Sequence, residues 1–89
     1  MSTSAREDLI QEENRRLRRM RFLVDLTLSV LYQDPRLTLG EARQMVRRTE
    51  RAVLGMFPDK EFTFHLLLMP RFERVLRKRW GKGMEPTIH

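Results

Sequence analysis

The segment from Arg19 to Gln33 carries apolar side chains around most of a helical circumference. At about 100° per residue, the apolar residues between Met20 and Leu31 cover an arc of roughly 240°, whereas an ordinary surface helix buries a stripe somewhat over 100° wide. The polar strip that remains is narrow and consists of Arg18, Arg21, Asp25 and Ser29, with Tyr32 beside them. We therefore expect this helix to be covered from several sides, by its own chain and by a second copy.

Capping residues and prolines divide the chain into three predicted helices. Ser4 with Glu7, and Thr38 with Glu41, match the capping box, in which the hydroxyl and the carboxylate each accept a hydrogen bond from a free backbone N–H group. Asp34-Pro35 ends the first helix, because proline disfavours the helical conformation in the residue before it. Phe57-Pro58-Asp59 reads as a second stop followed by a new start. The predicted helices run from about 5–33, 39–56 and 60–80, in a single helical domain of residues 1–81 followed by a flexible tail, 82–89.

The third helix is the least regular of the three. Residues 62–69 combine strand-like alternation with a continuous apolar run, but helical spacing of large apolar residues continues through Pro70 to Trp80. Proline cannot donate the hydrogen bond to the carbonyl of Leu66, so we expect the helix to be kinked or split at Pro70. Gly81 is a typical helix stop.

The predicted fold is all-α, an up-down-up arrangement of three helices with a long N-terminal helix. The first helix would be roughly 43 Å long and the second roughly 27 Å, so the stretch from Arg6 to Arg15 projects beyond its own chain. This end either frays or pairs with another helix, and we favour a compact dimeric bundle. The residues predicted for self-association share the seven-residue spacing or the wide apolar arc: Ile10, Leu17, Met20, Val24, Leu28 and Leu31.

Composition supports a small interaction protein without naming its partner. The 89 residues contain no cysteine, which is compatible with a cytoplasmic protein and excludes disulfides as a source of stability. The apolar segment 22–32 is about half the ~20 residues that span a bilayer, and it contains Asp25, so we expect no membrane association. The net charge is +6, and arginine supplies most of the cations.

Basic rows on two helices raise the alternative of nucleic-acid binding. Arg43, Arg47 and Arg51 recur at four-residue intervals, and a second row contains Arg71, Arg74 and Lys78. Such rows could neutralise successive phosphates, but acidic residues are interleaved with most of them and no base-reading pattern accompanies them. The simpler interpretation is a solvated helix face.

No arrangement of residues indicates catalysis. There are two histidines and no cysteine, the glycines are scattered, and His65 with Glu61 supplies two metal ligands where a site needs at least three from protein. We expect no enzyme activity, no cofactor and no metal. The sequence therefore predicts a small non-enzymatic interaction or regulatory module that forms a homodimer or other homo-oligomer through its first helix. The alternatives are a dimeric nucleic-acid-associated protein and a subunit of an obligate complex with a different protein.

Overall fold

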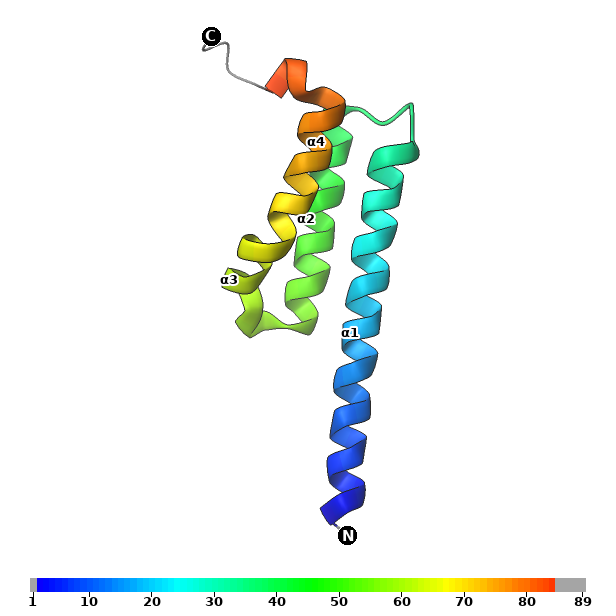
Figure 1. The fold of residues 1–89 in the computed structure, drawn as a ribbon, viewed down its shortest axis with the longest axis vertical. Helices are drawn as coiled ribbons and strands as arrows, with labels where there is room; N and C mark the ends of the chain where they lie inside the picture. Colours follow the sequence, from blue (N-terminus) through cyan, green and yellow to red (C-terminus); the bar gives the residue numbers. More distant parts are fainter. Residues whose placement is uncertain (1, 85–89) are drawn as a thin grey trace.

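The computed structural model describes residues 2–84, which are helical apart from short connections and contain no strand (Figure 1). The predicted all-α class is confirmed for this part of the chain. The elements, in order, are α1 (Ser2–Gln33), α2 (Leu39–Met56), the 3₁₀ turn η1 (Pro58–Lys60), α3 (Glu61–Thr63), the π-helical turn η2 (Phe64–Leu68) and α4 (Met69–Met84).

Helix α1 is longer at its N-terminus than the sequence predicts. It begins at Ser2, so Ser4 lies inside the helix and the predicted N-terminal capping box is wrong. The helix continues because no glycine or proline occurs before Pro35. Its end is fixed by a turn, in which the N–H of Arg36 donates to a carboxylate oxygen of Asp34 at 2.9 Å.

Helix α2 has the predicted capping box at its start. The Thr38 hydroxyl accepts from the Glu41 N–H at 3.1 Å, and the Glu41 carboxylate accepts from the Thr38 N–H at 3.0 Å. Its buried residues follow at intervals of three or four, which places them on one side of the helix: Ala42, Val46, Thr49 and Val53.

The third segment changes from π-helical to α-helical winding just before Pro70, without a break in the helical backbone. The N–H of Met69 bonds to the carbonyl of Phe64, five residues back, so the turn before the proline is π-helical. A wider turn leaves room for the proline ring, which would otherwise meet the carbonyl of the preceding turn. The kink in this segment lies at Trp80 instead, where φ is −123° and ψ is 21°. The helix then runs on to Met84, so part of the predicted tail is helical, and residues 85–89 lie outside the described range.

One core joins the three long helices where they lie side by side. Its buried apolar residues come from every long element and from η2: Val24, Leu31, Ala42, Val46, Val53, Phe57, Phe64, Phe72, Val75 and Leu76. Two threonines are buried among them, and their hydroxyl oxygens are 2.6 Å apart. The Thr27 hydroxyl also donates to the Leu23 carbonyl at 2.9 Å, so the core contains a satisfied polar link between α1 and α2.

An arginine of α4 holds the C-terminal end of α1. The Arg79 guanidinium donates to the Leu31 carbonyl and, at 2.7 Å, to the Asp34 carbonyl. Carbonyls in the last turn of a helix have no partner within that helix, and a cation is favourable there. The same guanidinium lies 4.4 Å from the ring centre of Trp80. Arg79 therefore links α4 to the C-terminal end of α1, at the end of the bundle that lies away from the N-terminus.

The molecule is elongated because α1 outruns its companions. It measures 63 × 26 × 15 Å, and its radius of gyration is 16.7 Å, against about 12 Å for a compact domain of this length. In Figure 1, the N-terminal part of α1 extends alone beyond α2 and α3. Every residue from 5 to 16 is exposed, and Leu17 is the first that is partly buried. We call residues 5–16 the overhang.

Candidate interaction surface

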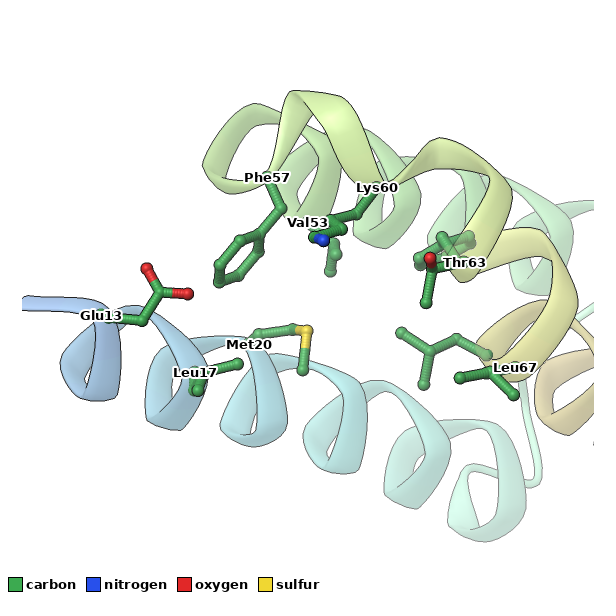
Figure 2. Close-up of a pocket in the computed structure, with 10 residues that line it drawn as sticks. Glu13, Leu17, Met20, Val53, Phe57, Lys60, Thr63 and Leu67 are labelled. Atoms are coloured by element: carbon green, nitrogen blue, oxygen red, sulfur yellow. The ribbon is translucent and has the colours of Figure 1, made fainter. Parts of the chain in front are cut away.

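An apolar groove opens where the overhang leaves the bundle. We call it the end groove, and it has a volume of about 270 Å³. One wall is α1 and the other is the chain from the end of α2 to η2 (Figure 2). Its lining residues are Glu13, Leu17, Met20, Val53, Phe57, Lys60, Thr63, Phe64, Leu67 and Leu68. Most of this surface is hydrocarbon, with the charged groups Glu13 and Lys60 among the lining.

The end groove exists because the third segment does not pack closely along α1 at this level. Phe57 reaches toward α1 from the end of α2, and Met20 lies on the opposite wall (Figure 2). Leu67 also lines the groove, yet it is 60% exposed. Its place in the π-helical turn before Pro70 depends on the wider winding there. Apolar lining that is open to water on one side is a favourable place for another apolar side chain.

The overhang carries two exposed apolar side chains on α1, a few residues before the first groove residue, Glu13. Leu9 is 69% exposed and Ile10 is 53% exposed. Glu13, one turn further on, already lines the groove, so the apolar part of the overhang leads directly into it. A helix of this length without tertiary contacts is marginal in water. The expected overhang is thus confirmed in the structure, although residues 5–16 make it slightly longer than predicted.

The structure divides the residues predicted for self-association into two groups. Ile10 is exposed, and Leu17, Met20 and Leu28 are partly buried. Val24 and Leu31 are only 2% and 0% exposed, because α2 and α4 cover that side of α1 within the same chain. Those two residues belong to the core of the single chain. The prediction that they contribute to a surface between chains is therefore wrong.

The sequence did not predict the end groove, which brings together residues distant in the chain. Leu17 and Met20 were expected in an interface, but the opposite wall depends on how the chain turns after Phe57. The signal that could have indicated it is the run of three leucines at 66–68, which contains more apolar side chains than one helix face can bury.

Other large apolar side chains lie on the outside of the bundle. On α1, Phe22 is 68% exposed and Leu26, one turn later, is also exposed. On the third segment Phe62 and Leu66 form a similar pair at four-residue spacing. The exposed pair on α1 belongs to the wide apolar arc seen in the sequence, and it stays open because the chain covers only one side of α1.

Charge is strongly segregated along the N-terminal half of α1. The acidic segment, residues 7–13, contains four carboxylates and no cation: Glu7, Asp8, Glu12 and Glu13. The arginine segment, residues 15–21, contains five arginines and no carboxylate: Arg15, Arg16, Arg18, Arg19 and Arg21. All nine residues are exposed. One ion pair joins the two segments within the chain, between Glu12 and Arg16 at 2.9 Å.

The basic row predicted on α2 is exposed, and part of it lines a shallow depression. Arg47 and Arg51 line it together with Arg48 and Gln44. Arg43 is exposed but lies outside this depression. The second predicted row is also exposed: Arg71, Arg74 and Lys78.

His65 contacts a carboxylate on a different helix. Its Nε2 lies 2.7 Å from a carboxylate oxygen of Glu50 on α2, and its ring packs edge-on against Phe64. This arrangement links η2 to α2. Within residues 2–84, no three histidine, cysteine, aspartate or glutamate side chains are placed to hold a metal ion.

Comparison with known protein families, curated proteins and solved structures finds no match for this chain. In the part of the chain that the structure describes, no helix combines the length and the apolar character needed to cross a bilayer.

Proposed function

We propose that this protein is a small non-enzymatic interaction or regulatory module, an up-down-up helical unit that self-associates through α1 into a dimeric bundle. The observation that supports it is the continuity of an exposed apolar overhang with an open apolar groove on the same helix. Each is incomplete alone: the overhang has no core to pack on, and the groove has no side chain that fills it.

The free energy of burial favours a second chain as the partner of this helix. Complete burial of a leucine or isoleucine side chain contributes about 1.5–3 kcal/mol, and two copies would bury Leu9 and Ile10 twice. Pairing would also order a helical end that is marginal alone. A chain of 89 residues has only one small core, and association is a common way for so small a scaffold to gain stability.

The test replaces both exposed residues of the overhang by polar helix formers. In L9Q/I10Q we expect the apparent mass to fall from dimer to monomer at micromolar concentration, measured by size-exclusion chromatography with light scattering. F22Q is the matched control, because Phe22 is equally exposed but lies beside the bundle rather than on the overhang. A dimer that survives L9Q/I10Q and dissociates in F22Q would contradict the proposal and move the interface to the outer face of α1.

A second candidate function is binding of nucleic acid by α2. The depression with Arg47, Arg48 and Arg51 favours it, since three guanidinium groups at one place could contact neighbouring phosphates. The R47E/R51E variant should abolish binding of a fluorescent oligonucleotide at about 50 mM salt and leave the oligomeric state unchanged. Absence of binding by the unmodified protein under these conditions would eliminate this candidate.

A further inference from the structure

We propose that the overhang of each chain is the ligand of the partner's end groove, in an antiparallel pair of α1 helices. This inference rests on the proposed self-association and adds the direction, the approximate register and the residues exchanged. Three observations carry it: the charge segregation along α1, the level of the groove along the helix, and the size of the groove.

The charge segregation determines the direction. In a parallel, in-register pair, the acidic segment would face the acidic segment and the arginine segment would face the arginine segment. Like charges along the whole contact oppose such pairing. In an antiparallel pair centred near Asn14, each acidic segment lies beside the arginine segment of the other chain. Apart from Glu12 with Arg16, none of these nine charged side chains has an ion-pair partner among the described side chains of residues 5–81, so a second chain can supply partners for the others.

The same register brings the overhang to the groove. With the two-fold axis near residue 14, position 9 of one chain lies at the level of position 19 of the other, and position 10 at the level of 18. Leu17 and Met20, the α1 wall of the end groove, occupy that level. The pairing of charges and the docking of Leu9 and Ile10 are therefore both met by the same antiparallel register, although they involve different residues.

The end groove has room for these two side chains. An apolar cavity of about 150 Å³ holds a benzene molecule, and the groove measures about 270 Å³. Leu9 and Ile10 of the partner would enter between Met20 and Leu67. Met20 is unbranched and adapts to the shape of the incoming side chains.

Charge exchange tests the pairing. E7R/D8R and R19E/R21E should each weaken self-association about tenfold, because each places like charges opposite each other in the antiparallel pair. A one-to-one mixture should associate with an affinity close to that of the unmodified protein. E73R on α4 is the control, since Glu73 is exposed and lies outside both segments. Unchanged dimerisation of E7R/D8R would overturn the inference.

Cysteine cross-linking tests the direction independently, because the chain contains no cysteine of its own. E7C and R21C, mixed under mild oxidation, should form a disulfide between the two variants, whereas E7C alone should form none. Positions 7 would be roughly 20 Å apart in the antiparallel pair, far beyond the 7 Å that a disulfide spans. Efficient cross-linking of E7C with itself, or none in a mixture that remains dimeric, would overturn the antiparallel register while the proposed self-association would stand. An unmodified protein that stays monomeric would overturn both.

Discussion

The two buried threonines show how a small core accepts polar atoms at a single position. The Thr27 hydroxyl has one proton, which it donates to the Leu23 carbonyl, so the short contact with Thr49 requires Thr49 to be the donor. Each hydroxyl therefore depends differently on the other. Thr49 loses its acceptor if Thr27 is replaced, whereas Thr27 keeps its own acceptor if Thr49 is replaced.

This asymmetry leads to a prediction for valine substitutions, which conserve side-chain shape. T27V should lower the free energy of unfolding by about 1–3 kcal/mol, because the Thr49 hydroxyl is left buried without its acceptor. T49V should cost less, about 0.5–1.5 kcal/mol. The double variant should cost less than the sum of the two, since no hydroxyl then remains unpaired. Urea unfolding of the three variants measures this: a larger cost for T49V than for T27V would contradict the assigned donor direction, and strict additivity would show that the two hydroxyls are not coupled.

Arg79 is the residue whose charge connects the ends of α1 and α4. R79A should lower the free energy of unfolding by about 1.5–3 kcal/mol, because two carbonyls lose a charged donor. K78A, at the neighbouring position, is the control. It should change the free energy of unfolding by less than about 0.5 kcal/mol, because the Lys78 side chain is exposed. Thermal unfolding of both variants gives the comparison. Equal effects would show that the contacts of Arg79 do not stabilise the bundle.

At the scale of elements, α1 is one continuous helix with two environments. Its C-terminal half packs in the core, whereas residues 5–16 are all exposed and contribute nothing to the core. The two parts should differ in hydrogen exchange, because a helical end without tertiary contacts opens with little cost.

Pairing of the overhang should therefore make exchange depend on protein concentration. We expect the amides of residues 8–16 to exchange rapidly in dilute protein and to become protected as the concentration rises through the dimer dissociation constant. The amides of α2 should keep the same protection throughout, which provides an internal control. Hydrogen exchange followed by mass spectrometry measures both. Protection of the overhang that does not change with concentration would contradict pairing through α1.

Local signals predicted the elements better than they predicted the contacts between them. The capping box at Thr38 involves neighbours in sequence and is seen in the structure. The Ser4 box failed, because a matching pair of residues does not start a helix where the preceding residues can also be helical. The burial of Val24 and Leu31, the Arg79 link and the far wall of the end groove depend on residues distant in the chain. Hydrophobic periodicity identifies the apolar face, but it does not specify which neighbour covers it.

The whole molecule is a short bundle with one helix extended well beyond it. Its core covers one side of α1, and the end groove, the overhang and the outer pairs of apolar side chains stay open to water. Segregated charge on the extended helix gives a reason for antiparallel pairing.

Sedimentation equilibrium of the 89-residue chain at micromolar concentrations measures self-association directly. We expect a reversible equilibrium whose limiting mass is twice the 10.8 kDa of the single chain. A mass of one chain at every concentration would show that the exposed helix end and the open groove coexist without a second copy, and would contradict the proposed function.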